Sequence, residues 1–305
     1  MDYQVTIASI TYNEEKYIED ALKGWLAQET DFRYEILVSD DGSTDHTRDI
    51  ITQYMAIYPN IRLINTGHIG GMANFIRLLQ ESKGKYVALC EGDDYWIDPN
   101  KLQKQYDFLE SHPDFSACFT NSYVLNTLTG EKVIAKKKVW DVASTKDLLL
   151  HRDDDNVQMS PGHTSTFFYR NQFLQSYPQW WYGTVLGDFS LYMLMSKYGK
   201  AKFINDITSV YRHRPDGVSS KNYSFVNSVL ERIYTYKHVN RDFKYKYIRI
   251  INPIIADYYF SLGKRLYKTS NKLKGLWYSL LACAYNPSIP FSMIRKKREK
   301  EKTIT

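Results

Sequence analysis

The first third of the chain alternates short apolar runs with longer segments in which apolar residues recur every three or four positions. The short runs are typical of buried strands, and the longer segments are typical of helices that pack one face on a sheet. Strands are expected at residues 4–10, 34–39, 61–64 and 85–90, and helices at 14–27, 47–57, 73–81 and 98–109. This alternation predicts βαβ units and a mostly parallel sheet.

The remainder of the chain changes character at about residue 220. Before it, strands are expected at 115–126, 132–139, 164–169, 201–204 and 209–212, with a helix at 188–198. After it, helices are expected at 223–239, 245–267 and 272–285, the second interrupted or kinked by Pro253. We therefore expect an α/β domain over residues 1–220 and a helical appendage over residues 221–305.

Composition narrows the class of protein. Hydrophobic residues make up 43% and charged residues 24% of the 305 positions, as in a soluble globular protein. The three cysteines, Cys90, Cys118 and Cys283, form no CxxC pair, which argues against a disulfide framework or a zinc site. Neither a signal peptide nor an apolar run of about 20 residues is visible, so we expect a cytoplasmic protein.

The charge is unevenly distributed along the chain. Residues 231–305 carry 17 Lys and Arg against 5 Asp and Glu, whereas residues 1–230 carry 23 against 29. A basic helical region of this kind favours an anionic membrane surface at the inner face of the plasma membrane. The alternative is a subdomain that packs on the catalytic domain or on a second copy, which leaves a homo-oligomer open. No nucleic-acid-binding motif is present, so nucleic acid is not expected as a partner.

Two acidic clusters follow predicted strands. Asp40 and Asp41 come after the second strand, and Glu91, Asp93 and Asp94 come after the fourth. The carboxyl ends of parallel strands meet at one edge of a sheet, where ligands bind. Because carboxylates placed together repel, they indicate a bound cation or a hydroxyl-rich ligand. A divalent metal on a diphosphate would suit their hard oxygens. Each cluster alone is also compatible with an ordinary turn or helix cap.

The combination of these segments resembles glycosyltransferase family 2, whose members have the GT-A fold. The resemblance covers about residues 3–220 and depends on four sequence segments: TIASITYNEE at 6–15, VSDDGSTD at 38–45, GKY at 84–86 and EGDD at 91–94. It implies a GT-A, Rossmann-like nucleotide-diphospho-sugar transferase fold. It also implies an inverting glycosyltransferase that uses a nucleotide-sugar donor.

The resemblance assigns roles in binding the donor. Asp41 is expected to accept a hydrogen bond from the base, commonly uracil, and Asn74 to face the nucleotide. Asp93 and Asp94 match the DXD-type element, one near the ribose and one on Mg²⁺ or Mn²⁺ at the diphosphate, whereas Glu91 stands where the family usually has Asp. The same base pocket is expected to be lined by Thr11, Tyr12, Asn13 and Glu14.

The second half of the α/β domain is expected to supply the base. Asp188 opens a helix in a motif that usually reads Glu-Asp, although Gly187 occupies the first position here. As general base it would take the acceptor hydroxyl proton; a helix N-cap is the alternative role. Tyr211-Arg212-His213-Arg214 resembles a segment near the donor phosphates that often reads Tyr-Arg-x-His. Arg212 is therefore expected to contact the donor, and a role for His213 or Arg214 is left open.

Together these features predict transfer of a sugar from a nucleotide donor, a UDP-sugar, to a saccharide or lipid-linked acceptor in polysaccharide biosynthesis. Two alternatives remain. A sugar nucleotidyltransferase would require a glycine-rich loop with Arg and Lys after the first strand, where this chain has Thr11-Tyr12-Asn13-Glu14. A non-catalytic nucleotide-sugar-binding scaffold would not need Asp188.

Overall fold

The computed structural model describes residues 3–65, 67–135, 141–150, 162–173, 176–215, 217, 224–269 and 271–289. The chain divides into two compact units. The first, called here the N-terminal unit, comprises residues 1–183 and 187–221; the second, the C-terminal unit, comprises residues 184–186 and 222–305.

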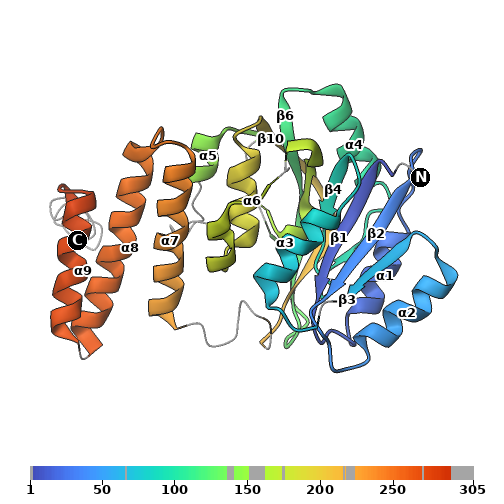
Figure 1. Ribbon diagram of the computed structural model, residues 1–305, viewed down its shortest axis with the longest axis horizontal. Helices are drawn as coiled ribbons and strands as arrows, with labels where there is room; N and C mark the ends of the chain where they lie inside the picture. Colours follow the sequence, from blue (N-terminus) through green and yellow to red (C-terminus); the bar gives the residue numbers. More distant parts are fainter. Residues whose placement is uncertain are drawn as a thin grey trace. The chain divides into compact units, whose positions relative to one another are not determined.

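The N-terminal unit is built on one mixed sheet (Figure 1). Its strand order is β3-β2-β1-β4-β9-β6-β10-β5, with β7 paired to β6 and β8 to β10. Strands β1 to β4 are parallel, whereas β9 lies antiparallel between β4 and β6. The strands are β1 Val5–Thr11, β2 Tyr34–Asp40, β3 Ile61–Asn65, β4 Tyr86–Leu89, β5 Tyr95–Trp96, β6 Phe115–Asn126, β7 Lys132–Ile134, β8 Val142–Ala143, β9 Phe167–Arg170 and β10 Lys200–His213.

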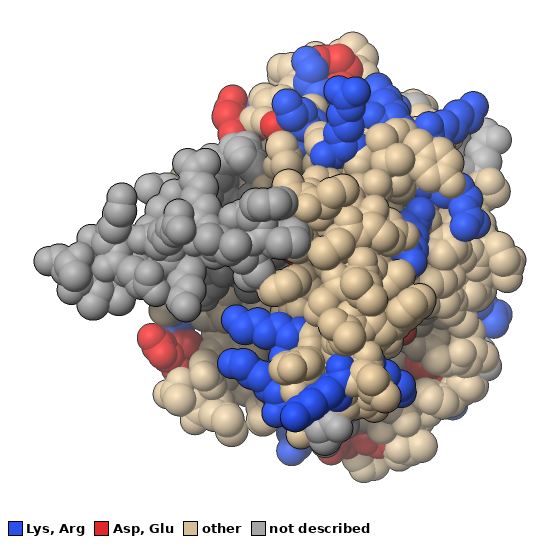
Figure 2. Space-filling model, turned by 90° about the vertical axis from the view of Figure 1, so that its left-hand side faces the viewer, with Lys and Arg blue, Asp and Glu red and all other residues tan. Residues whose placement is uncertain are grey.

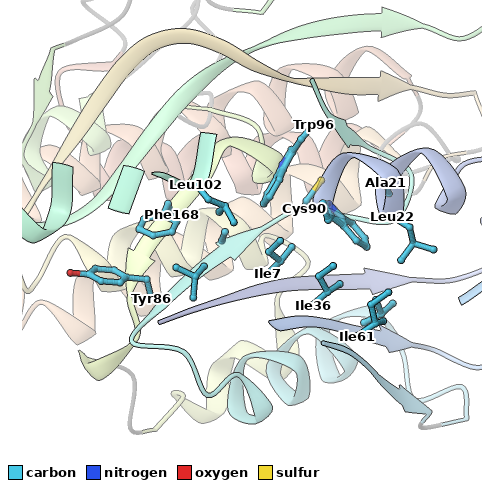
Figure 3. Close-up of a cluster of buried hydrophobic side chains, with 14 of the residues drawn as sticks. Ile7, Ala21, Leu22, Ile36, Ile61, Tyr86, Cys90, Trp96, Leu102 and Phe168 are labelled. Carbon is cyan, nitrogen blue, oxygen red and sulfur yellow. The ribbon is translucent and has the colours of Figure 1, made fainter. Parts of the chain in front are cut away.

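Helices cover both faces of this sheet because successive strand residues point to opposite sides. Ile7 belongs to a core with helices α1, α2 and α4, whereas its neighbour Ala8 belongs to a second core with α3 and α6. Figure 3 shows the first core, in which Trp96 and Phe168 lie with Ile7. The helices are α1 Ile18–Leu26, α2 Thr47–Ile57, α3 Gly71–Glu81, α4 Lys101–Ser111, α5 Thr145–Leu150 and α6 Gly187–Met195.

The predicted α/β class with a mostly parallel N-terminal half is confirmed, and two local expectations need correction. The expected strands at 201–204 and 209–212 are one strand, β10, which stays paired with β6 through register shifts around Ile207. The strand expected at 164–169 begins with a 3₁₀ turn at Thr164–Thr166 and becomes extended from Phe167. Residues 136–139 of the strand expected at 132–139 lie outside the described residues.

The C-terminal unit contains helices α7 Phe225–Asp242, α8 Ile248–Thr269 and α9 Lys272–Tyr285 (Figure 1). Ser224 and Asn271 cap α7 and α9 by accepting backbone N–H bonds from Asn227 and Lys274. Helix α8 continues through Pro253, so the expected interruption there is absent. No helix in the described part of the chain is long and apolar enough to cross a bilayer.

Candidate active site

The loops that carry the predicted site residues flank the carboxyl end of β1. The Asp41 amide donates to the Thr11 carbonyl at 3.0 Å, and the Gly92 amide donates to the Ile10 carbonyl at 3.0 Å. The acidic loops after β2 and β4 are therefore attached to opposite sides of the same strand end. This is the arrangement that the order of parallel strands predicts.

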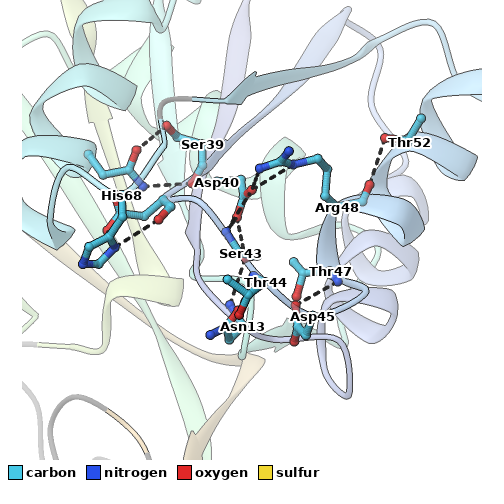
Figure 4. A network of polar contacts seen from close by, with 12 residues as sticks. Asn13, Ser39, Asp40, Ser43, Thr44, Asp45, Thr47, Arg48, Thr52 and His68 are labelled. Atoms are coloured by element: carbon cyan, nitrogen blue, oxygen red, sulfur yellow. Dashed lines mark hydrogen bonds and ion pairs between the residues drawn. The ribbon is translucent and has the colours of Figure 1, made fainter.

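A polar network joins the loop after β1 to the loop after β2 (Figure 4). Asn13 has a left-handed backbone with φ of 54°; its amide donates to Ser43 Oγ at 2.9 Å, and its side-chain oxygen accepts the Thr44 amide at 2.8 Å. The buried Asp40 accepts the Ser43 amide at 3.1 Å and pairs with Arg48 at 3.2 Å. Asp40, which the sequence left without a role, therefore holds the Asp-Gly-Ser-Thr turn in shape.

Asp41 organises the loop that leads into α3. Its carboxylate accepts the amides of Ile69 at 2.8 Å and Gly70 at 3.1 Å, and it contacts His68 Nδ1 at 3.1 Å. The His68 ring in turn lies 5.1 Å from the ring of Tyr12, centroid to centroid. Gly42 has φ of +79°, and a Cβ there would lie 2.7 Å from the backbone nitrogen of His68. This turn therefore requires glycine.

Asn74 lies at the start of α3 and is buried. Its side-chain NH₂ donates to the Ser39 carbonyl at 2.9 Å, and its side-chain oxygen accepts from Ser39 Oγ at 2.6 Å. Both ends of the amide therefore join α3 to β2. The expected contact with a nucleotide stays a prediction beside this packing role.

Four carboxylates gather between the ends of β1 and β4. Glu14 is buried, and loss of hydration together with Asp93 raises its pKa well above the usual range. Loss of hydration, then the charges of Asp93 and Asp188, raise the pKa of Glu91 to about 8. The pKa of Asp94 is raised by burial first and then by Asp93 and Glu91. The cluster thus holds more carboxylates than its surroundings stabilise in charged form.

Gly92 permits this close approach. A Cβ at Gly92 would lie 2.4 Å from Glu14 Oε2 and 2.8 Å from Thr11 Oγ1. Those two oxygens are joined to each other, because the Thr11 hydroxyl donates to Glu14 at 2.8 Å. Only glycine lets the loop after β4 pack against this bonded pair.

Two arginines from the end of β10 face the acidic cluster. Arg214 pairs with Asp93 at 3.0 Å and lies 3.7 Å from Glu14. The Arg212 amide donates to Asp94 Oδ1 at 2.8 Å, and its guanidinium donates to the Asp93 carbonyl at 2.8 Å and pairs with Asp20. The sequence left the choice between His213 and Arg214 open, and it is Arg214 that contacts the carboxylates, whereas His213 is exposed.

Asp188 lies in the first turn of α6, where its carboxylate accepts the amide of Phe189 at 2.6 Å. Its charge raises the pKa of Glu91, so the two carboxylates are close enough to interact. A Cβ on Gly187 would lie 3.0 Å from Met72 Sδ and 3.2 Å from the Phe75 ring. This tight packing against α3 gives a physical reason for glycine where a larger residue is usual.

The carboxylate oxygens of Asp93 and Asp94 are compatible with a metal ion that is shared with a nucleotide. Asp94 Oδ2 is buried and has no hydrogen-bond partner among the described residues. Nowhere in the described ranges do three or more His, Cys, Asp or Glu side chains form a group that could hold a metal by itself. Mg²⁺ commonly takes only one or two carboxylates and completes its shell with phosphate and water oxygens. Asp93 and Asp94 have the oxygen chemistry for such a shared site.

Two contributors to this site, His68 and Tyr17, were missed by sequence reasoning. His68 contacts both Asp41 and Tyr12, and Tyr17 lies beneath both arginines, with the Arg212 and Arg214 guanidinium carbons 5.2 and 4.7 Å from its ring centroid. Both positions are ordinary in sequence, because a loop histidine and a tyrosine before a helix have many uses. Only the folded chain brings these two residues to Asp41 and to the arginines that contact the carboxylates.

Comparison with curated proteins finds relatives for part of the chain. The model of Glycosyl transferase family 2 matches residues 6–174. An uncharacterised protein of Mycobacterium tuberculosis is 48% identical over 117 residues, which are 38% of this chain and 34% of that relative. TuaG of Bacillus subtilis, whose name links it to teichuronic acid biosynthesis, is 36% identical over 106 residues, 34% of this chain and 41% of TuaG. The chain thus covers well under half the length of these relatives.

Solved structures share the fold over most of the chain. S. aureus TarS 1–349 in complex with UDP-GlcNAc has a TM-score of 0.66 at 19% identity, over 92% of this chain and 79% of that chain. The mannosyltransferase PcManGT from Pyrobaculum calidifontis, in complex with GDP-Man and Mn²⁺, has a TM-score of 0.59 at 17% identity. The match covers 98% of this chain and 80% of that chain. The predicted GT-A fold is confirmed.

Proposed function

Because the chain belongs to glycosyl transferase family 2, we propose that it transfers a sugar from a nucleotide-sugar donor, a UDP-sugar, to a saccharide or lipid-linked acceptor. The observation that carries this proposal is the gathering of Glu14, Glu91, Asp93 and Asp94 at the ends of β1 and β4, with Asp188 close enough to raise the pKa of Glu91. Such a concentration of carboxyl groups favours a ligand that is cationic or donates protons. TuaG, by its name, supports a polysaccharide pathway.

The nucleotide would bind at the loops after β1 and β2. Tyr12 is 44% exposed and its ring lies against His68, so it offers a surface on which a base can stack. Asp41 would accept a hydrogen bond from the base. Arg212, which bonds to the loop after β4, would contact the nucleotide-sugar. The proposed donor-binding residues are Thr11, Tyr12, Asn13, Glu14, Asp41, Asn74, Asp93 and Arg212.

Asp93 and Asp94 would hold a divalent metal, Mg²⁺ or Mn²⁺, together with the donor diphosphate. Such an ion, when bound, stabilises negative charge on the leaving diphosphate. TarS with UDP-GlcNAc and PcManGT with GDP-Man and Mn²⁺ support this choice of ligands. Arg214 is already paired with Asp93, so its guanidinium is available to balance the same charge.

Asp188 would act as the general base. Its carboxylate takes the proton of the acceptor hydroxyl while that oxygen forms a bond to the anomeric carbon. The bond from the anomeric carbon to the diphosphate oxygen breaks in the same displacement, and the sugar inverts. Correct placement of a base of this kind contributes about 10²- to 10⁴-fold to a rate.

The wider setting is also a proposal. Residues 1–220 would form the catalytic domain, and residues 221–305 would attach a cytoplasmic enzyme to the anionic inner face of the plasma membrane. The basic excess of residues 231–305 supports this attachment. A homo-oligomer stays an open alternative for the same region.

Donor turnover and donor binding, measured separately, test the proposal. Asp188→Asn is expected to lower transfer or hydrolysis of a UDP-sugar by at least about a hundredfold while calorimetry still detects UDP with Mg²⁺. Asp31→Asn, an exposed aspartate in the turn before β2, is the matched control and should retain activity. UDP binding without turnover in the native chain would favour the scaffold, and pyrophosphate release from a sugar phosphate and UTP would favour the nucleotidyltransferase.

A further inference from the structure

Helix α9 has apolar residues on the side that faces away from its packing partner α8. Gly275 and Ala282 are buried, and a Cβ on Gly275 would lie 2.6 Å from the Tyr267 nitrogen and 2.8 Å from the Gly263 carbonyl. The two helices are therefore in backbone contact along one line. This contact fixes which side of α9 is turned outward.

The outward side forms what is called here the apolar face. Leu273 is 83% exposed, Leu276 53%, Trp277 60% and Leu280 57%. Their spacing of three, four and seven positions places them within about 100° of one another around the helix. A helix surface in a globular protein is normally polar on its exposed side, whereas among the described residues this apolar face has no partner that covers it.

Exposed basic residues lie at both ends of α8, the helix on which α9 packs. At the end of the hairpin where α8 turns into α9, Lys264, Arg265, Lys268, Lys272 and Lys274 are exposed. At the opposite end, between α7 and α8, the exposed residues are Arg241, Lys244, Lys246 and Arg249. Figure 2 shows this side of the molecule, where a broad band of uncharged residues lies between groups of Lys and Arg.

Acidic residues are missing from the second half of α8 and from α9. Between Asp257 and Glu299 the chain has no Asp or Glu, but it has nine Lys and Arg. Exposed Lys and Arg in a stretch of sequence without acidic residues are usual where the partner supplies the negative charge. The partner of α9 is therefore expected to be anionic beside the basic residues and hydrophobic where it contacts the apolar face.

We propose that the apolar face of α9 is a membrane-docking surface, which inserts among the headgroups of an anionic bilayer while the flanking Lys and Arg bind lipid phosphates. Helix α9 has 14 residues, or about 21 Å, which is too short to span the roughly 30 Å hydrocarbon core and suits a helix lying in the interface. Trp277 is the aromatic type that favours this depth.

A second copy of the chain fits the same face less well. Facing copies would bring the lysines that flank the two α9 helices together, and like charges oppose that contact. A stable interface also buries about 800 Å² on each partner, more than four partly exposed side chains on one short helix supply. Charge and area therefore favour lipid. This inference rests on and deepens the membrane attachment proposed above for residues 221–305. It concerns the C-terminal unit alone and does not depend on the proposed transferase chemistry.

Co-sedimentation of the full chain with vesicles tests the proposal. The chain should bind vesicles of phosphatidylcholine with phosphatidylglycerol, bind phosphatidylcholine vesicles weakly, and release at high salt. Leu276→Glu combined with Trp277→Glu should weaken binding about a hundredfold, because two apolar side chains no longer insert. Lys272→Gln combined with Lys274→Gln should weaken it about fivefold for each lysine. Leu128→Glu, a matched change at an exposed turn of the N-terminal unit, should have no effect.

A second measurement reports insertion directly. Brominated lipid should quench the fluorescence of the bound native chain, and Trp277→Phe should remove most of that quenching while the chain still binds. The proposal is overturned if the native chain ignores anionic vesicles, or if the double Glu variant, shown by circular dichroism to be folded, binds as the native chain does. A dimer in sedimentation that the double Glu variant disperses, with no vesicle binding, would assign the face to a second copy instead.

Discussion

Replacing Glu91 by Gln removes a carboxyl group that the folded protein holds in protonated form near neutral pH. Its pKa rises from the ordinary 4.5 to about 8 because of lost hydration and the charges of Asp93 and Asp188. A folded-state pKa above the unfolded value means that the folded chain binds the proton more tightly. The stability from this group is therefore complete below pH 4.5 and is lost as the pH rises toward 8.

The size of this effect follows from the two pKa values. Between pH 5 and pH 8 a single group with this shift lowers the free energy of unfolding by about 3 kcal/mol. The raised pKa values of Glu14 and Asp94 act in the same direction. The unfolding free energy of the native chain should fall across this range, and Glu91→Gln should flatten the decline because it removes one of the titrating groups.

Urea unfolding at a series of pH values, followed by fluorescence, measures this slope. Glu131→Gln, at an exposed glutamate in the turn before β7, is the control and should retain the native slope. UDP with Mg²⁺ should raise the stability of the native chain most at pH 8, because a cation favours the charged carboxylates. Equal slopes for the native chain and Glu91→Gln would refute the reasoning.

Three further predictions concern packing and the metal. Gly92→Ala should lower the melting temperature by several degrees and weaken UDP binding, because its Cβ would lie 2.4 Å from Glu14 Oε2; thermal unfolding with and without UDP measures both. Gly275→Ala should destabilise the C-terminal unit by about 1 to 3 kcal/mol, since backbone atoms of Tyr267 and Gly263 block the new methyl group, and hydrogen exchange over α8 and α9 should increase. Chelation of divalent metal should abolish UDP-sugar turnover and added Mn²⁺ should restore it; turnover that survives chelation contradicts the roles given to Asp93 and Asp94.

Local patterns were sufficient to predict most elements of the N-terminal unit. The helix at 47–57 has the bounds that its apolar spacing indicates, and β6 has the bounds expected for 115–126. Periodicity succeeds there because each element buries one face against the same sheet. It failed at β10, where residues 205–208 resemble a turn but remain in the strand because β6 offers backbone partners on both sides of the irregularity.

The sequence also indicated where the carboxylates would gather, because parallel strands place their carboxyl ends at one edge. The sequence could not indicate which basic residues balance the negative charge of these carboxylates. Arg212 bonds to Asp94 from 118 positions away, and Arg214 reaches Asp93 from the same distant strand. Such pairs depend on strand order, which no local pattern encodes.

The apolar face of α9 shows the same division. The sequence determined that residues 272–285 form a helix with leucine, tryptophan and alanine on most sides. Which side is covered was decided by the tertiary structure, because Gly263 and Gly275 let the backbones of α8 and α9 touch along one line. Only that contact turns Leu273, Leu276, Trp277 and Leu280 outward, since a helix that is apolar all round has no pattern of its own to choose its packed side.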